Sequence, residues 1–277
     1  MPARKPSPVK PSRPKAVTKV APVGGVSPVP GRGEVEPPGR RSVGGKLQPT
    51  LAAAIDIRPE AVDDDTLLEI LTRLSAADPE PRSDLEYLNP YTLLVAVVLS
   101  AQATDRSVNL ATAPLFALAD DPQAMLDLGE ERVRGFIRTI GLFNTKAKNV
   151  IALSRILVEQ HGGEVPRQRE HLEVLPGVGA KTASVVLNVA FGEPRIAVDT
   201  HIFRIANRIP LFPAPTTDKV QAGLEARVPE RFRLNAHHWL ILFGRYVCKA
   251  RRPECPRCPI ADLCRYPSKT MESRSQP

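Results

Sequence analysis

Leu-Pro-Gly-Val-Gly-Ala-Lys, residues 175–181 of a 277-residue chain, contains the turn that says most about how the chain folds. A Pro-Gly-x-Gly turn leaves backbone N–H groups free at the start of the following helix, and such a helix end attracts phosphate through its unpaired donors and its dipole. We therefore predict two helices joined by a hairpin, with Gly177 and Gly179 against a nucleic-acid backbone. Lys181 falls in the first turn of the second helix, where the positive end of the dipole favours the neutral amine that can act as a nucleophile.

The charge of the chain indicates a polyanionic partner. Its 38 Lys and Arg residues exceed its 30 Asp and Glu residues, which gives a formal net charge of +8. Nucleic acid is the first candidate for such a protein. The longest apolar run, Leu93–Leu99, is far short of the ~20 residues that a membrane span needs, and the proline-rich N-terminus has no signal-peptide core. We expect no membrane partner and no secretion signal, and a cytoplasmic, nucleoid-associated protein if the source is bacterial.

The chain divides by composition into a tail and a helical body. Residues 1–60 are rich in Pro, Gly, Arg and Lys and cannot bury enough apolar surface to fold, so we predict a disordered basic tail. The tail is either a solvated leader or a DNA tether of salt-sensitive affinity. From Thr66 onward, apolar residues recur at helical spacing, which predicts an all-α fold. We expect two helical lobes with the active site between them: a bundle with the hairpin over 83–193, a lobe with the cysteine loop over 61–82 plus 194–270, and a flexible end at 271–277.

Ten helices are expected from the apolar spacing and from the end signals. Asn144 is a residue of the type that caps helices, and we expect it to begin the fifth of them. The predicted helices are residues 65–76, 91–100, 105–117, 130–139, 145–161, 169–175, 180–191, 200–207, 218–226 and 233–247.

The four cysteines form one local group and not a disulfide framework. Cys248, Cys255, Cys258 and Cys264 are separated by six, two and five residues. Four thiolates can close a zinc site or hold an iron-sulfur cluster, and the single C-x-x-C pair favours iron-sulfur while leaving zinc as the alternative. The cations around the loop predict phosphate contacts that add affinity without reading sequence. They are Arg245, Lys249, Arg251, Arg252, Arg257 and Arg265.

Three motifs, taken in this order, resemble one family. They are Leu-Ser-Ala-Gln-Ala-Thr-Asp at 99–105, the hairpin with Lys181 followed by Val-Asp-Thr-His at 198–201, and the C-x6-C-x2-C-x5-C loop. Between residues 66 and 266 the chain resembles the endonuclease III family, which are bifunctional DNA glycosylases and apurinic/apyrimidinic lyases of the helix-hairpin-helix superfamily. The resemblance implies a 4Fe-4S cluster with a structural and DNA-binding role. It also implies a monomer whose partner is double-stranded DNA containing damaged pyrimidines or abasic sites.

The resemblance also assigns roles to residues. Lys181 would attack C1′ of the sugar, displace an oxidised pyrimidine and leave a Schiff base, from which β-elimination cleaves the strand. Asp199 would stabilise positive charge on the sugar, and as an aspartate it could equally cap the helix from Thr200. Gln102 resembles the residue that fills the space of the extruded base, and Leu142 resembles the residue that intercalates from the other side.

Three further residues are weaker candidates for the same site. Asp105 could border the active-site cleft or only cap its helix. Glu173 could act beside the hairpin or only face solvent, and His201 could act next to Asp199 or only pack in the core.

Other functions stay open as alternatives. An adenine-removing glycosylase of the superfamily shares the hairpin, the aspartate and the cluster but ordinarily lacks the lysine. A lyase-dominant or narrowed-specificity paralogue would carry the same motifs as this chain. A non-catalytic damage-binding protein would have lost Lys181 or Asp199, and both are present.

Overall fold

The computed structural model describes residues 59–270, and this part of the chain is helical with no strand. The predicted disordered segments, 1–60 and 271–277, lie almost wholly outside the described residues. Residues 59–270 confirm the all-α prediction, and none of their helices is both long and apolar enough to span a bilayer. The helices are α1 (Asp64–Ala77), α2 (Pro90–Ser100), α3 (Asp105–Phe116), α4 (Pro122–Leu128), α5 (Glu130–Ile137), α6 (Phe143–His161), α7 (Arg169–Glu173), α8 (Ala180–Phe191), α9 (Thr200–Arg208), α10 (Thr217–Arg227) and α11 (Glu230–Tyr246), followed by one 3₁₀ turn, Cys255–Arg257.

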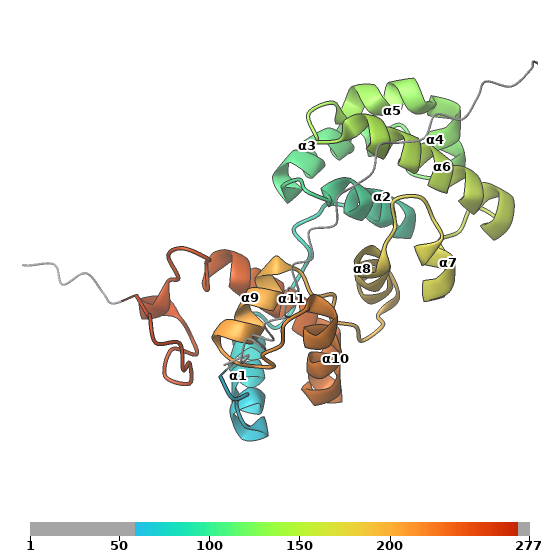
Figure 1. Ribbon diagram of the computed structural model, residues 1–277. Coiled ribbons are helices and arrows are strands. Elements are labelled where there is room, and N and C mark those ends of the chain that lie inside the picture. The colour runs from blue at the N-terminus through green and yellow to red at the C-terminus, as the bar shows by residue number, and fades with distance from the viewer. Residues whose placement is uncertain (1–58, 271–277) are drawn as a thin grey trace, which may run out of the picture. The chain divides into compact units, whose positions relative to one another are not determined.

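Helices α2 to α8 enclose one hydrophobic core (Figure 1). The central element is α2, in which every residue from Tyr91 to Leu99 is buried, as expected of a helix that is apolar on all sides. Its start is fixed by a capping box: Asn89 Oδ1 accepts from the Thr92 N–H at 2.9 Å, and Thr92 Oγ1 accepts from the Asn89 N–H at 2.9 Å. Helices α3, α6 and α8 pack against α2.

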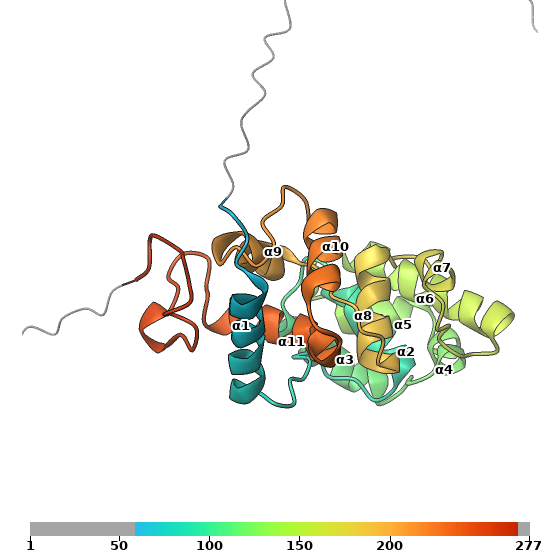
Figure 2. The ribbon, with the colours of Figure 1, turned by 90° about the horizontal axis from the view of Figure 1, so that it is seen from below.

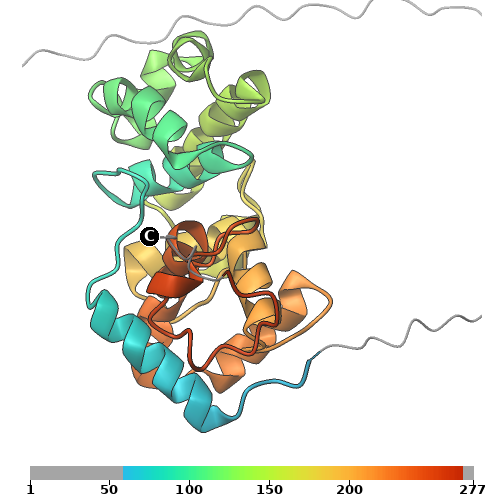
Figure 3. The ribbon, with the colours of Figure 1, turned by 90° about the vertical axis from the view of Figure 1, so that its left-hand side faces the viewer.

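A second core is built from α1, α9, α10, α11 and the cysteine loop. Although α1 precedes the first core in the sequence, it packs on α11, and Figures 1 and 3 place it beside the C-terminal helices. The two clusters of buried residues run over 85–187 and over 62–74 plus 196–260. We propose 83–193 and 61–82 plus 194–270 as the lobe boundaries, which these clusters support.

One hydrogen bond joins α8 to the second core, because Asn188 donates to the Leu234 carbonyl of α11 at 3.0 Å. In Figure 2, α8 lies on the side of the first core that faces α10 and α11. Within the second core, Trp239 Nε1 of α11 donates to the Asp78 carbonyl at the end of α1 at 2.7 Å, which holds α1 against α11.

Two local predictions are wrong. Helix α4 was not predicted, because it has only seven residues; its signals are Asp121, whose side chain accepts from the Ala124 N–H at 2.8 Å, and Pro122 in the first turn. Asn144 does not cap α6, because that helix starts earlier with Leu142 in the cap position and has no side-chain cap. The other helix ends differ from the predicted ones by up to three residues.

Candidate active site

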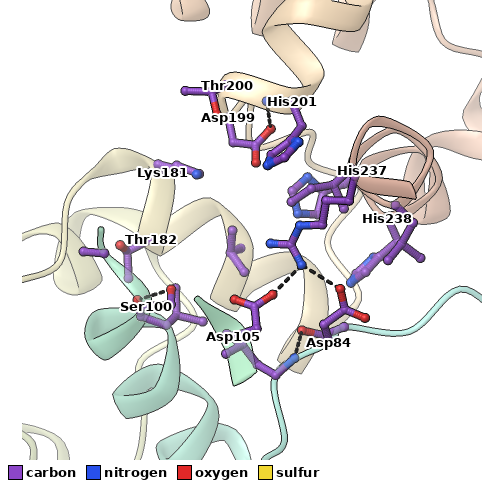
Figure 4. A pocket seen from close by; sticks show the side chains of 18 of the residues that line it. Asp84, Ser100, Asp105, Lys181, Thr182, Asp199, Thr200, His201, His237 and His238 are labelled. Atoms are coloured by element: carbon purple, nitrogen blue, oxygen red, sulfur yellow. Dashed lines mark hydrogen bonds and ion pairs between the residues drawn. The ribbon is translucent and has the colours of Figure 1, made fainter. Parts of the chain in front are cut away.

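A cleft of about 330 Å³ opens between the two cores. Five residues singled out from the sequence line it: Lys181, Asp199, Gln102, Asp105 and His201. They come from α8, the start of α9, the loop after α2, and α3. Figure 4 shows Lys181 and Asp199 extending from separate elements toward the same space. Residues spread over a hundred positions of sequence are thus brought together at one opening.

The hairpin before α8 needs glycine at one position. Gly177 has φ +82°, in the left-handed region, and a Cβ there would lie 2.9 Å from Asn149 Nδ2 and 3.2 Å from Val98 Cγ1. The turn is closed by the Val178 N–H donating to the Leu175 carbonyl at 3.0 Å. Its conformation is therefore fixed by the backbone of Gly177.

Gly179 occupies the cap position of α8 and has open space around it. A Cβ added to Gly179 would meet no atom within 4 Å, and α8 has no side-chain cap. The first N–H groups of a helix have no partner within it, so those of α8 face outward with the positive end of the dipole. This arrangement suits an incoming anion.

Lys181 is the second residue of α8 and is exposed at the edge of the cleft. Its neighbour Thr182 also lines the cleft, and the next residue, Ala183, is fully buried against α2. The buried face of α8 therefore turns the lysine toward the opening. A primary amine is held next to the uncapped helix end.

Asp199 is buried to 8% exposure although it lines the cleft. Its Oδ1 accepts from the backbone N–H groups of His201 and Ile202, both at 2.8 Å. The carboxylate therefore caps α9, which confirms the predicted capping of the helix from Thr200. Because both bonds use Oδ1, they fix the direction of the whole group toward the cleft.

Gln102 and Leu142 share an unusual backbone. They are the only non-glycine residues with positive φ in the part of the chain that the structure describes, at +57° and +61°. Both side chains are exposed, Leu142 to 62%. Gln102 borders the cleft, and Leu142 begins α6 on the adjacent loop, where a Cβ on Gly141 would lie 4.0 Å from the Gln102 carbonyl. Left-handed backbone at non-glycine residues costs free energy and is typical of functional sites.

Arg245 joins the two cores at the base of the cleft. It forms ion pairs with Asp105 and, at 2.7 Å, with Asp84, and Tyr246 donates its hydroxyl to Asp84 at 2.8 Å. Arg245 therefore lies in the cleft, paired with two carboxylates, and its predicted contact with DNA phosphate stays a prediction. Lys249 and Arg257 are also paired, both with Glu254, which leaves Arg251 and Arg252 exposed.

His237 and His238 of α11 form part of the wall of the cleft. His237 is 3% exposed, and its Nδ1 is the one buried side-chain nitrogen or oxygen in residues 59–270 without a hydrogen-bond partner. Burial, with His238 and Lys181 nearby, lowers the pKa of His237 to about 3. The imidazole is therefore neutral at physiological pH.

The three weaker candidates separate clearly. Asp105 and His201 line the cleft, and Asp105 is the partner of Arg245. Its helix α3 is instead capped by Thr104, so Asp105 is not the cap residue that the alternative required. Glu173 is not among the residues of the cleft and pairs with Arg169 one turn away on α7.

The four cysteines surround one small space. Cys248, Cys255, Cys258 and Cys264 all line it together with Arg208 and Tyr266. Four cysteine thiols around one space are the donor set of a 4Fe-4S cluster, so the residues present fit that group.

Four residues of the cleft were not singled out as site residues from the sequence: Arg82, Ser100, Thr182 and Arg245. Ser100 belongs to the motif at 99–105 and Thr182 follows Lys181, so both could have been inferred from the quoted motifs. Arg82 and Arg245 reach the cleft through the packing of the helices, which no local spacing shows.

Comparisons with known proteins agree with this geometry. Residues 95–230 match the HhH-GPD superfamily of base excision DNA repair proteins, and residues 248–264 match the iron-sulfur binding domain of endonuclease III. Endonuclease III of Escherichia coli is 57% identical over 202 residues, which are 73% of this chain and 96% of that protein. Endonuclease III of Haemophilus influenzae is 55% identical with the same coverage.

A solved structure of a trapped endonuclease III–DNA covalent intermediate has the same arrangement. It is 41% identical, covers 74% of this chain and 97% of its own, and superimposes with a TM-score of 0.70. A thermostable thymine-DNA glycosylase, 24% identical, shares the fold with a TM-score of 0.66 and coverages of 73% and 97%.

Proposed function

The chain belongs to the endonuclease III family of helix-hairpin-helix base-excision DNA repair proteins, and from this premise we propose that its cleft removes oxidised pyrimidines from duplex DNA. It is a DNA N-glycosylase and apurinic/apyrimidinic lyase, and it binds DNA. It carries a 4Fe-4S cluster, for which we propose Cys248, Cys255, Cys258 and Cys264 as the ligands. The cluster has a structural role and takes no part in bond breaking.

The observation that carries the residue assignments is that Lys181 and Asp199 line one cleft beside the uncapped end of α8. The free N–H groups of α8 bind a phosphate of the DNA backbone, with Gly179 leaving room for its approach. The sugar attached to that phosphate then lies beside the lysine. Positioning of this kind lowers the barrier by converting a bimolecular attack into an intramolecular one.

Lys181 is the proposed nucleophile. Its neutral amine forms a bond to C1′ while the bond from C1′ to the base breaks, and the base leaves with the electron pair and takes up a proton that the amine loses. The C1′–O4′ bond then opens, O4′ gains a proton, and a Schiff base joins Lys181 to C1′. Loss of a proton from C2′ expels the 3′ phosphate oxygen and breaks the strand.

Asp199 is proposed to stabilise the positive charge that develops on the sugar as the base departs. Its carboxylate is directed by two backbone hydrogen bonds of 2.8 Å, so it does not have to reorganise during the reaction. A fixed charge in a partly buried site acts more strongly than one in water.

Gln102 and Leu142 are proposed as the residues that enter the duplex. Extruding a base costs a few kcal/mol, and side chains that fill the vacated space hold the duplex open. Both are exposed; Gln102 lines the cleft, and the loop that carries Leu142 lies next to the Gln102 loop. Their left-handed backbone projects both side chains from tight loops.

The cleft lining supports ring-saturated pyrimidines as the substrate. None of the described residues that line it is Phe, Tyr or Trp; its only rings are the small imidazoles of His201, His237 and His238, and its hydroxyl groups include those of Ser100 and Thr182. A planar base gains much of its binding energy by stacking on aromatic rings, whereas a non-planar oxidised pyrimidine cannot stack well. Its added hydroxyl groups can instead use polar side chains.

A panel of lesions tests the substrate assignment. Duplexes carrying thymine glycol, dihydrouracil, 8-oxoguanine or adenine opposite 8-oxoguanine are compared in single-turnover excision. We expect excision of the first two and not of the purines. Faster removal of adenine would overturn the assignment in favour of the adenine-removing class, and cleavage of abasic DNA alone would favour a lyase-dominant paralogue.

We further propose that the protein acts as a monomer on chromosomal DNA. One copy supplies the cleft, the hairpin and the cysteine loop, so no second copy is needed to complete the site. The mass of the DNA complex in solution tests this, because a dimer would double the protein mass per duplex.

A further inference from the structure

Lys146 is a buried cation that the proposed chemistry does not use. It is the fourth residue of α6 and is 5% exposed. Within residues 59–270 it has no carboxylate at ion-pair distance. Its Nζ donates instead to two backbone carbonyls, those of Leu99 at 2.9 Å and Ala101 at 2.7 Å. Burying an ammonium is costly unless its hydrogen bonds are made, so this placement is unusual for a lysine.

The two acceptors lie at the C-terminal end of α2. The last carbonyls of a helix have no partner within it and carry the negative end of the dipole. Helix α2 has no basic residue in its own last turn, and Ala101 follows its last residue. Lys146 therefore supplies, from a different helix, both the charge and the donors that this end lacks.

The same side chain connects the two left-handed residues. Ala101 immediately precedes Gln102, with φ +57°, and α6 begins at Leu142, with φ +61°. The Lys146 N–H donates to the Leu142 carbonyl at 3.0 Å, while its side chain reaches the carbonyl before Gln102. An unfavourable backbone persists only where the surroundings hold it, and Lys146 is the group that contacts both loops.

We propose that Lys146 is a positioning residue for base extrusion, holding the Gln102 loop against the Leu142 loop so that both side chains are directed into the duplex. This rests on the proposed function, because it assumes that these two residues enter DNA. Lys146 does not touch the reacting atoms. Removing the Lys146 side chain therefore makes it harder to hold a base outside the duplex. Cleavage of a nucleotide that is already unpaired should stay intact.

Lys146→Met removes the ammonium and keeps an unbranched chain of similar volume. The matched control is Arg155→Met, which removes one exposed cation from the same helix. Single-turnover cleavage is measured on three substrates: thymine glycol in duplex, thymine glycol in a single strand, and a preformed abasic site in a single strand. All assays run well below the melting temperature of each variant.

The expected result is a loss of about tenfold or more on the duplex lesion, because only that substrate needs a stacked base to be held out. The single-stranded substrates should change by less than about threefold, and Arg155→Met should change none of the ratios. Lys146→Arg, which keeps a cationic donor, should restore part of the duplex rate. Equal losses on all three substrates would overturn the proposal, since they would mean only a damaged fold. If Lys146→Met does not fold, Lys146→Gln takes its place in the same comparison.

A double variant separates this proposal from the assignments it rests on. If Lys146 acts through the Gln102 loop, adding Lys146→Met to Gln102→Ala should cause little further loss of the duplex rate. Additive losses would overturn the proposal while leaving the Gln102 assignment standing. A Gln102→Ala variant with an unchanged ratio of duplex to single-strand rates would overturn both. Cleavage of the abasic single strand is independent of either and reports the lyase activity itself.

Discussion

Replacing Gly177 by alanine should destabilise the hairpin in a way that can be worked out from its geometry. Its φ of +82° is left-handed, which costs an L-residue about 1–2 kcal/mol. The new Cβ would lie 2.9 Å from Asn149 Nδ2 and 3.2 Å from Val98 Cγ1, and such overpacking costs about 1–3 kcal/mol. We expect a total of about 2–5 kcal/mol, or a fall in melting temperature on the order of 10 °C.

Gly179→Ala is the matched control two residues away. Its φ is −103°, and a Cβ there meets no atom within 4 Å. Alanine is a poorer cap residue than glycine by less than about 1 kcal/mol, so the melting temperature should change by no more than about 3 °C. The added methyl group would stand where the proposed phosphate approaches. Losing a charge-assisted hydrogen bond of about 1.5–3 kcal/mol should weaken binding about tenfold to a hundredfold.

The assay combines thermal unfolding with binding to a duplex that carries an uncleavable abasic analogue, at one fixed salt concentration. We expect Gly177→Ala to lose stability and Gly179→Ala to lose affinity for the duplex. An unchanged melting temperature for Gly177→Ala would show that the turn does not depend on left-handed backbone. Unchanged affinity for Gly179→Ala would refute the phosphate site at the start of α8.

Three further predictions concern single residues. Asp199→Asn keeps an oxygen that can cap α9, so the free energy of unfolding should change by less than about 1 kcal/mol, while the rate of base excision should fall by a factor on the order of 10²–10⁴. Equal excision rates for the parent protein and Asp199→Asn would show that the charge of Asp199 has no role. Cys258→Ser should yield protein without brown colour, with lower iron content and lower stability, and a colourless variant that melts like the parent would show that the cluster is not structural. Folding lowers the pKa of His237 from 6.5 to about 3, so below pH 6.5 the unfolded state binds a proton that the folded state does not, and the free energy of unfolding falls as the pH falls. Between about pH 7.5 and 5, the free energy of unfolding should fall by about 2 kcal/mol more in the parent protein than in His237→Gln. Equal falls in the two proteins, measured by acid unfolding, would contradict this.

Local sequence predicted those parts of the fold that local chemistry controls. Gly177 is needed by the turn itself, and Asp199 caps the helix that follows it directly, so both could be inferred from neighbouring residues. The apolar run of α2 predicted a helix enclosed on all sides. The short α4 escaped because seven residues give too little periodicity to recognise.

Residues whose role depends on distant contacts could not be predicted. Arg245 was grouped with the cysteine loop by its position in the chain, yet its partners Asp84 and Asp105 lie about 140–160 residues away. Lys146 reaches carbonyls 45 and 47 residues earlier. His237 enters the cleft because α11 packs beside α9. Such roles follow from how helices pack, which no local spacing encodes.

Borohydride trapping identifies the nucleophile on which the proposed reaction depends. The protein is incubated with a thymine glycol duplex and reductant, and the adduct is digested and mapped by mass spectrometry. We expect the sugar remnant to be attached to Lys181, and we expect Lys181→Ala to form no adduct while still binding DNA. An adduct on any other residue, or one that persists in Lys181→Ala, would contradict that expectation.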